Sequence, residues 1–302
     1  MKVLITGATG LVGTAITRQC RDAGIEVHYL TTRPEKIRNE PGYTGFVWDP
    51  SEGSMDPQSL SGVQAIINLA GASIAQPWTQ ANRKRIQQSR TDSLSTLFNQ
   101  LSKHGKGEVE YLVSASAIGI YPHSYTEYHT EADGNTGQGF LAETVRLWEA
   151  GVRDFDSLGI PCGILRLGLV LAAHEGALPA IARPVKAFVG APLGNGRQWQ
   201  SWIHLNDAAA LFLFAVDQRL EGVFNAVAPN PVTNEKLTRQ VAEALDKPLW
   251  LPRIPAWFLR LVLGDRAALV LDSQRVCSDK VRMEGFGFGF ANLQPALEDL
   301  LT

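Results

Sequence analysis

The sequence predicts an α/β fold in which one parallel sheet is covered by helices on both of its faces. Two observations point to this fold. Short apolar runs of strand length recur along the first 170 residues, and longer segments with helical spacing separate them. Strands that alternate with helices pair in parallel, because each crossover helix returns the chain to the same end of the sheet. The expected architecture is a doubly wound parallel sheet with a smaller C-terminal α/β lobe.

The elements are expected in a regular order. The first strand is the run Val3–Ile5, and the helix after it begins at Leu11 and is stopped by Gly24. Wholly apolar runs of this length are typical of strands that are buried on both faces. Further strands are expected at Val27–Leu30, Phe46–Trp48, Ala65–Ala70, Tyr111–Ser114 and Cys162–Arg166, and further helices at Trp78–Ser102 and Phe140–Leu158.

The pattern changes beyond about residue 170. Pro179, Pro184 and Pro192, together with a glycine-rich stretch, are expected to break regular structure there. A helix is expected again at Val232–Leu245. We assign residues 1–170 to the first domain, with about 203–228 returning to it, and residues 171–202 and 229–302 to the smaller lobe.

Composition excludes several classes of protein. A net charge of -2 over 302 residues does not provide the concentrated basic surface that nucleic-acid binding requires. Gly7 cuts the first apolar run short of a signal peptide, and no later run reaches the roughly 18 residues of a membrane span. Cys20, Cys162 and Cys277 lie far apart and lack metal-ligand spacing. We expect a soluble cytoplasmic protein in a reduced compartment, without nucleic-acid, membrane or metal partners.

A glycine-rich turn follows the first strand and opens the first helix. Gly7 permits the tight turn, Gly10 lets the backbone approach a pyrophosphate, and Gly13 lets the helix pack closely on the strand. The N–H groups at a helix start also favour anionic phosphates. This strand–turn–helix context predicts a dinucleotide site. Its candidate residues in the turn are Gly7, Thr9, Gly10, Leu11, Val12 and Gly13.

The end of the second strand indicates which dinucleotide is bound. Folds that prefer NAD carry an acidic residue there, which binds the ribose hydroxyls. This chain has Thr31, Thr32 and Arg33 instead, and Lys36 follows. Two hydroxyls and a guanidinium suit the 2′-phosphate of NADP, so we expect NADP(H) as the cofactor. Asp49, at the end of the third strand, either accepts from the adenine amino group or forms a local turn.

Motifs over nearly the whole chain resemble those of one family. The phosphate loop and the strand ends Asn68–Gly71 and Ser114–Ser116 are similar to those of extended short-chain dehydrogenases/reductases. Other motifs resemble the atypical subgroup called the epimerase family, close to bacterial proteins labelled nucleoside-diphosphate-sugar epimerase. These motifs are Ser89-Arg90, Ser116–Tyr121, Trp148-Glu149, Leu165–Gly168, Gly196–Gln198, Trp202–Asp207, Asn225–Pro229 and Gly285–Phe288.

The resemblance carries expectations about fold and contacts. It implies a Rossmann-type fold and a small-molecule substrate in the smaller lobe, and the label implies a nucleotide sugar without establishing one. It also implies cofactor contacts from Leu69, Ala70 and Gly71, which follow the fourth strand. Arg166 ends the sixth strand near the cofactor edge, where it either holds an anionic group or pairs with Glu149. The oligomeric state stays open, a homodimer included.

The catalytic pair of the superfamily is missing. Its members usually carry a Tyr and a Lys four residues apart on the helix after the fifth strand, on one helical face. The Tyr is the acid/base, and the Lys lowers its pKa. Alignment of this helix on Glu149 places Leu141 and Val145 at the two positions, and a shift of one places Phe140 and Thr144 there. The usual dehydrogenase mechanism is therefore not supported.

Other groups are candidates for proton transfer. Ser114 and Ser116 lie just past the fifth strand, where the resemblance places a substrate-contacting hydroxyl; the alternative is a satisfied strand-end hydroxyl. Tyr121 follows them and is the preferred acid/base, with a packed aromatic as the alternative. Arg197 either takes a substrate phosphate or has no functional role, and His204 is either an acid/base or a buried structural histidine.

Two functions remain open on the sequence. The leading hypothesis is an NADP-dependent oxidoreductase or epimerase with a non-standard acid/base, because the cofactor loop is complete. The alternative is a non-enzymatic redox sensor that binds NADP(H) and passes its state to a partner, because the Tyr–Lys pair is absent. Hydride transfer between a bound nicotinamide and any substrate distinguishes them.

Overall fold

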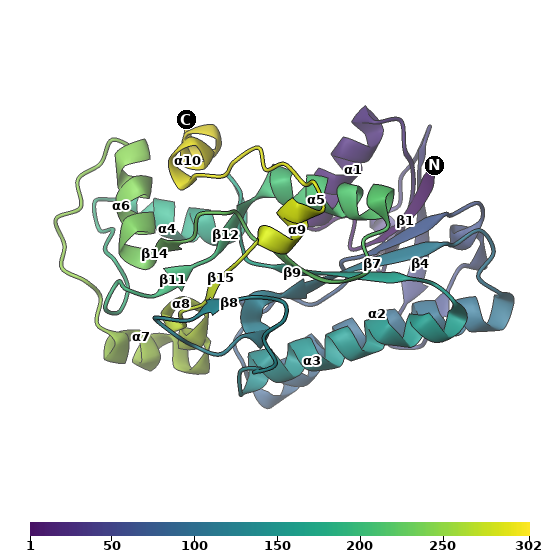
Figure 1. Ribbon diagram of the computed structural model, residues 1–302, viewed down its shortest axis with the longest axis horizontal. Helices are drawn as coiled ribbons and strands as arrows, with labels where there is room; N and C mark the ends of the chain where they lie inside the picture. The colour runs from purple at the N-terminus through teal and green to yellow at the C-terminus, as the bar shows by residue number, and fades with distance from the viewer. The chain divides into compact units, whose positions relative to one another are not determined.

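The computed structural model describes residues 1–302, which fall into two units (Figure 1). The first unit comprises Met1–Ala117, Gly139–Arg166 and Ala209–Phe224. The second comprises Ile118–Gln138, Leu167–Ala208 and Asn225–Thr302. No helix combines the length and the apolar character that crossing a membrane requires.

A nine-stranded sheet forms the centre of the first unit. Its strands follow the order β13-β9-β7-β6-β1-β2-β4-β3, with β5 paired to β4. Neighbouring strands from β7 to β4 pair in parallel, which confirms the predicted fold class. The strands are β1 (Lys2–Thr6), β2 (Glu26–Thr31), β3 (Asn39–Glu40), β4 (Tyr43–Asp49), β5 (Ser54–Met55), β6 (Ala65–Asn68), β7 (Tyr111–Ala117), β9 (Cys162–Leu167) and β13 (Gly222–Ala226).

The strand order reverses beside β1. The chain runs from β1 to β2 and β4 on one side, then crosses to β6, β7 and β9 on the other. In a doubly wound sheet, a crevice opens at such a switch point, outside the carboxyl ends of the strands. Gly7 follows β1 and Leu69 follows β6, so the topology brings both residues to this crevice.

Helices cover both faces of the sheet. Figure 1 shows α2 and α3 packed together on one face and α1 on the other. α1 buries Ala15, Ile16 and Cys20, and α2 begins after Thr79, whose hydroxyl accepts from the Asn82 N–H. The helical segments of this unit are α1 (Leu11–Asp22), η1 (Pro34–Lys36), η2 (Pro57–Leu60), α2 (Gln80–His104), α3 (Phe140–Arg153), η4 (Asp154–Leu158) and most of α5 (Leu205–Gln218).

The second unit is built from short strand pairs and helices. The pairs are β10 (Leu169–Leu171) with β12 (Trp202–His204), β11 (Trp199–Gln200) with β14 (Val232–Thr233), and β8 (Tyr128–His129) with β15 (Arg275–Val276). The helical segments are η3 (Ile118–Ile120), α4 (Ala177–Lys186), α6 (Asn234–Ala244), α7 (Ala256–Leu263), η5 (Gly264–Ala267), α8 (Ala268–Leu271), α9 (Asp279–Met283) and α10 (Leu293–Leu301). Leu171, Leu178, Trp202, Leu237 and Leu297 are buried in its core.

The sequence division and the two units differ by a few residues at the boundaries near 170, 203 and 228, and by one longer segment. Residues 118–138 belong to the second unit, although the division placed them in the first domain. Within the second unit β8 pairs with β15, and the Ser124 N–H donates to the Ser273 carbonyl at 2.8 Å. These partners lie about 150 residues further along the chain, so the local pattern does not reveal them.

The expectation that prolines break regular structure beyond residue 170 is wrong at two positions. Pro179 and Pro184 both lie inside α4. Pro179 falls in the first turn, where a backbone N–H has no partner within the helix. Pro184 falls in the last turn, and the helix ends two residues later at Lys186. A proline near either end of a helix therefore does not exclude the helix.

Candidate functional site

A cavity of about 610 Å³ lies at the switch point of the first unit. Its walls are the phosphate loop, the ends of β2 and β4, the turn after β6 and one face of α2. We call it the switch-point cavity. Ten of the predicted cofactor residues line it: Gly7, Thr9, Gly10, Thr31, Thr32, Arg33, Asp49, Leu69, Ala70 and Gly71.

The phosphate loop needs glycine at two positions for steric reasons. Gly7 has φ +71°, in the left-handed region, and a Cβ there would lie 3.0 Å from the Leu69 carbonyl oxygen. A Cβ on Gly13 would lie 2.2 Å from the Gly7 carbonyl oxygen, which would push α1 away from the loop. The close packing of helix on strand that the sequence predicts for Gly13 is therefore present.

The N-terminus of α1 carries backbone N–H groups without a side-chain cap. Gly10 is the N-cap residue, and no side chain accepts from the first turn. Leu11, Val12 and Gly13 occupy the first three helical positions, where the N–H groups have no acceptor within the helix. These three residues do not line the cavity, so their expected contribution is confined to the backbone. Such a helix end is suited to an anionic phosphate.

A buried network fixes the turn after β6. The Thr6 hydroxyl accepts from the Leu69 N–H at 3.0 Å and the Ala70 N–H at 3.1 Å, and donates to Asn68 Oδ1 at 2.8 Å. Asn68 Nδ2 in turn donates to Ser114 Oγ at 2.9 Å. Neither Thr6 nor Asn68 was assigned an individual role from the sequence. The network links β1, β6 and β7 at their carboxyl ends and holds the Leu69–Gly71 wall of the cavity.

The Ser89-Arg90 motif supports the same wall from α2. Ser89 Oγ accepts from the Ala72 N–H at 2.8 Å, and Arg90 Nη1 donates to the Ala72 carbonyl at 3.2 Å. The Arg90 guanidinium lies over the Trp148 ring, and a Cβ on Gly71 would come within 3.0 Å of it. Burial lowers the pKa of Arg90 to about 10, so the partly buried guanidinium is still charged near neutral pH. Glycine at position 71 leaves the room that the guanidinium occupies.

The ends of β2 and β4 present the residues expected to select the cofactor. The Thr31 hydroxyl accepts from the Arg33 N–H at 3.1 Å and so closes a turn, whereas the side chains of Thr32 and Arg33 are exposed at the cavity. Asp49 Oδ1 accepts from the Ser51 hydroxyl at 2.6 Å and the Ser51 N–H at 2.9 Å. These two hydrogen bonds lower the pKa of Asp49 from its ordinary value, and the bond from the Ser51 hydroxyl has the larger effect. Asp49 thus forms a local turn and also lines the cavity.

One wall of the cavity was not predicted from the sequence. Arg85, Gln88, Ser89 and Asp92 of α2 line it. Their spacing of three, four and seven residues places them on one helical face. The polar character of the segment was visible, but a polar helix face is also what solvent exposure produces.

A buried ion pair occupies the region where Arg166 was expected to meet the cofactor. Arg166 Nε and Nη2 donate to the two carboxylate oxygens of Glu149 at 2.8 and 2.9 Å. Ser116 Oγ donates to Glu149 Oε1 at 2.8 Å, and Arg153 Nη2 lies 3.3 Å from Oε2. Arg166 does not line the switch-point cavity. Of the two alternatives for Arg166, the structure therefore contains the pairing with Glu149.

Tyr121 is a buried residue of the second unit. Its hydroxyl donates to Asn225 Oδ1 at 2.8 Å, and its ring stacks on His129 with centroids 5.0 Å apart. The Asn225 amide donates to the Cys277 carbonyl at 3.0 Å, and its backbone N–H donates to Glu131 at 2.7 Å. All three predicted catalytic hydroxyls, those of Ser114, Ser116 and Tyr121, thus take part in hydrogen bonds within their own unit.

His204 has structural partners on both ring nitrogens. Nδ1 accepts from the Asn206 N–H at 3.1 Å at the start of α5, and Nε2 lies 3.1 Å from Asp299. Burial lowers the pKa of His204 and the Asp299 carboxylate opposes that shift. His204 therefore caps a helix, the structural alternative of the two that the sequence left open.

The Arg197 guanidinium lies over the Tyr125 ring, 5.6 Å from its centroid.

The cysteines lie outside the cavity. All three are free; Cys20 and Cys277 are buried, and Cys162 is partly buried. Burial raises the pKa of Cys20 and of Cys162 to about 12, so both thiols are protonated near neutral pH. No group of three or more His, Cys, Asp or Glu side chains is arranged to hold a metal ion.

Comparisons with known proteins agree with the motifs. Residues 3–226 match the NAD dependent epimerase/dehydratase family, and residues 254–300 match a domain of unknown function, DUF1731. The chain is 35% identical to an epimerase family protein of Staphylococcus epidermidis, over 99% of each protein. It is 34% identical to the epimerase family protein YfhF of Bacillus subtilis, over 100% of this chain and 98% of that protein.

A solved structure is similar over the same length. The human epimerase family protein SDR39U1 (isoform2), determined with NADPH, has a TM-score of 0.86 and 27% identity. The similarity covers 99% of this chain and 99% of the human chain. The family resemblance inferred from the motifs is confirmed. The chain belongs to the NAD dependent epimerase/dehydratase family, and its relatives there are the epimerase family proteins.

Proposed function

We propose that this protein binds NADP(H) in the switch-point cavity and is an oxidoreductase or epimerase whose small-molecule substrate is held by the second unit. One observation carries the proposal: the glycine loop, the uncapped start of α1 and Arg33 all meet at one cavity or border it. The human relative determined with NADPH supports the same assignment. The nucleotide-sugar class of substrate rests on the family resemblance.

Each wall of the cavity suits one part of the nucleotide. The N–H groups of Leu11–Gly13 would hold the pyrophosphate. Arg33 would bind the 2′-phosphate, and Asp49, ionised near neutral pH, would accept from the adenine amino group. The nicotinamide, when bound, supplies hydride transfer. The chain's own residues position the nucleotide. The Thr31–Arg33 stretch contains no Asp or Glu, and an acidic residue there would favour NAD.

The cofactor preference is tested by calorimetric titration with NADPH and NADH. NADPH is expected to bind more tightly, and Arg33→Ala is expected to weaken NADPH binding about tenfold, because a charge-assisted contact to phosphate is lost. NADH affinity should stay unchanged in that variant. Arg282→Ala, which removes an exposed arginine of α9 from the second unit, serves as the matched control. Equal affinity of the unaltered protein for both nucleotides contradicts the proposal.

A second function is favoured by a specific observation. The family chemistry usually uses a Tyr–Lys pair, which α3 lacks, and the hydroxyls of Ser114, Ser116 and Tyr121 are all engaged within the fold. A non-enzymatic redox sensor needs the dinucleotide site without an acid/base. Turnover of NADPH with any substrate of a broad screen, read at the nicotinamide absorbance, would favour the enzyme.

Within the enzyme proposal we assign the proton transfer to Tyr121. Ser114 and Ser116 are tied to the cavity wall and to the Glu149–Arg166 ion pair, whereas the Tyr121 hydroxyl donates to a neutral amide. Tyr121→Phe keeps the ring stack on His129 and removes only the hydroxyl. Turnover should fall by roughly 10²–10⁴-fold, with NADPH affinity unaltered. Activity within a few-fold of the parent would eliminate Tyr121 as the acid and move the assignment to Ser116.

A further inference from the structure

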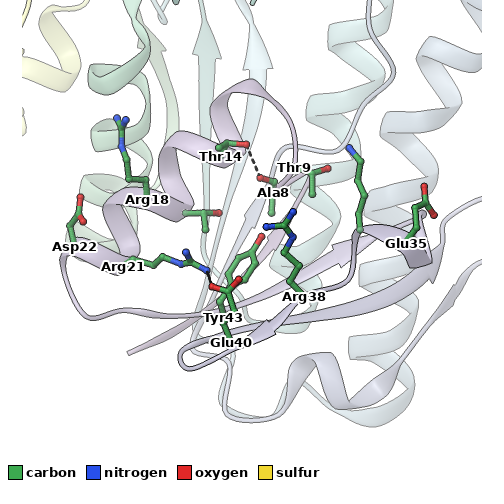
Figure 2. A pocket seen from close by; sticks show the side chains of 12 residues that line it. Ala8, Thr9, Thr14, Arg18, Arg21, Asp22, Glu35, Arg38, Glu40 and Tyr43 are labelled. Carbon is green, nitrogen blue, oxygen red and sulfur yellow. Dashed lines mark hydrogen bonds and ion pairs between the residues drawn. The ribbon is translucent and has the colours of Figure 1, made fainter. Parts of the chain in front are cut away.

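A second cavity, of about 540 Å³, borders the switch-point cavity in the same unit. The two cavities share Thr9 and Lys36 in their walls. We call the second one the α1 cavity, since α1 supplies much of its lining (Figure 2). Its charged residues are Arg18, Arg21, Asp22, Glu35, Lys36, Arg38 and Glu40.

Two cations of the α1 cavity stand out by position. Figure 2 shows Arg38 pointing from its loop toward Ala8 and Thr9 of the phosphate loop, whereas Arg18 and Asp22 lie in the C-terminal half of α1. Arg21 is held by Glu40 at 2.7 Å, so its charge is compensated. Lys36 and Arg38 form no ion pair. Lys36 and Thr9 line both cavities, and Arg38 lines the α1 cavity.

A buried tyrosine holds the backbone of both cations. The Arg38 N–H donates to the Tyr29 hydroxyl oxygen at 2.6 Å, and that hydroxyl donates to the Lys36 carbonyl at 2.9 Å. The Tyr29 ring is buried and stacks on Tyr43 with centroids 4.4 Å apart. A Cβ on Gly45 would lie 2.5 Å from the phenol, so glycine there makes room for the ring. The loop is therefore fixed before any ligand arrives.

This geometry suits the group that distinguishes NADP from NAD. A phosphate monoester carries about two negative charges at neutral pH, more than one guanidinium offsets. Arg33 lines only the switch-point cavity, Arg38 only the α1 cavity, and Lys36 both. A phosphate placed at the shared wall would therefore have cations available from both cavities. Cations whose backbone is already fixed lose less freedom on binding.

We propose that Lys36, Arg38 and the Thr9 hydroxyl form a second half of the 2′-phosphate subsite, opposite Arg33, and that Tyr29 is the positioning residue for both cations. This inference rests on the proposed NADP(H) site and deepens it. It predicts that selectivity for NADP(H) depends on a buried hydroxyl that touches no ligand. Because Tyr29 acts through the loop backbone, its effect should fall on the phosphate and spare the rest of the nucleotide.

Calorimetric titration of the full chain with NADPH and NADH tests the subsite. Arg38→Gln and Lys36→Gln should each weaken NADPH binding about tenfold and leave NADH affinity unchanged, because each removes a charge-assisted contact. Tyr29→Phe should lower NADPH affinity a few-fold, again without an effect on NADH. Arg21→Gln, which alters a cation of the same cavity that is bound to Glu40, should change neither affinity.

The outcomes separate this inference from the function on which it rests. If the unaltered protein binds NADPH no more tightly than NADH, the proposed NADP(H) function fails, and the subsite fails with it. If the parent prefers NADPH but Arg38→Gln and Lys36→Gln both keep the affinity ratio within twofold, only the subsite is overturned. Equal loss of both nucleotides in Tyr29→Phe would overturn its positioning role, and the two cation variants test the subsite independently of that residue.

Discussion

Replacement of Gly10 by valine is expected to weaken NADPH binding by more than about 100-fold, roughly 2.8 kcal/mol. Gly10 lines the switch-point cavity, and a branched side chain there would stand where the pyrophosphate must approach. Hydrogen bonds from the start of α1 to the phosphates would be lost as well. The backbone at Gly10 is extended (φ -88°, ψ 178°), a conformation that any residue adopts. An added Cβ would lie 3.3 Å from the Gly7 carbonyl oxygen, a contact that a small shift relieves, so most of the loss should fall on binding rather than on folding.

Gly134→Val provides the matched control for this experiment. An added Cβ at Gly134 meets no atom within 4 Å, and the residue lies in the second unit, away from the cavity lining. Its affinity for NADPH should equal that of the parent. Thermal unfolding of both variants should report a similar midpoint. A Gly10→Val protein that folds and still binds NADPH normally would show that the nucleotide lies elsewhere.

The second large effect is expected on stability, from Glu149→Gln. Glu149 is buried and binds Arg166 through both carboxylate oxygens. The amide keeps the shape of the side chain but leaves the buried guanidinium without the carboxylate that binds it. Removal of one partner from a buried ion pair typically costs about 3–5 kcal/mol. Urea unfolding should show a lower free energy of unfolding by an amount in that range.

An exposed acid on the same helix controls for loss of charge. Glu143 lies in the first turn of α3 and is exposed, so Glu143→Gln should cost less than about 1 kcal/mol. A double variant with Glu149→Gln and Arg166→Met should recover part of the loss, since no buried cation remains. Equal unfolding free energies for Glu149→Gln and the parent would mean that the pair adds nothing to stability.

The order of elements could be predicted because it depends on local pattern. Val3–Ile5, Ala65–Ile67 and Tyr111–Val113 are short apolar runs typical of a buried strand, and each lies in the sheet. The phosphate loop could be predicted as well, because the close contacts that require Gly7 and Gly13 involve the turn in which they lie. Prediction failed where the effect of a residue depends on its position within a helix, as for the prolines near the two ends of α4.

The partners of the candidate catalytic groups could not be predicted. Ser116 donates to Glu149, 33 residues away, and Tyr121 donates to Asn225, 104 residues away. A hydroxyl at a strand end looks the same in sequence whether it faces a substrate or a buried acceptor. Arg38 was missed for a related reason, because the hydroxyl of Tyr29, nine residues earlier on β2, holds its loop. Such contacts follow from packing between elements, and the local hydrophobic pattern of the sequence does not reveal that packing.

A crystal structure of this protein grown with NADPH tests the central claim most directly. We expect the pyrophosphate beside the N–H groups of Leu11–Gly13 and the 2′-phosphate between Arg33 on one side and Lys36 and Arg38 on the other. The adenine should lie near Asp49. A nucleotide bound anywhere outside the switch-point cavity, or bound in it with its 2′-phosphate turned away from all three cations, would contradict the account.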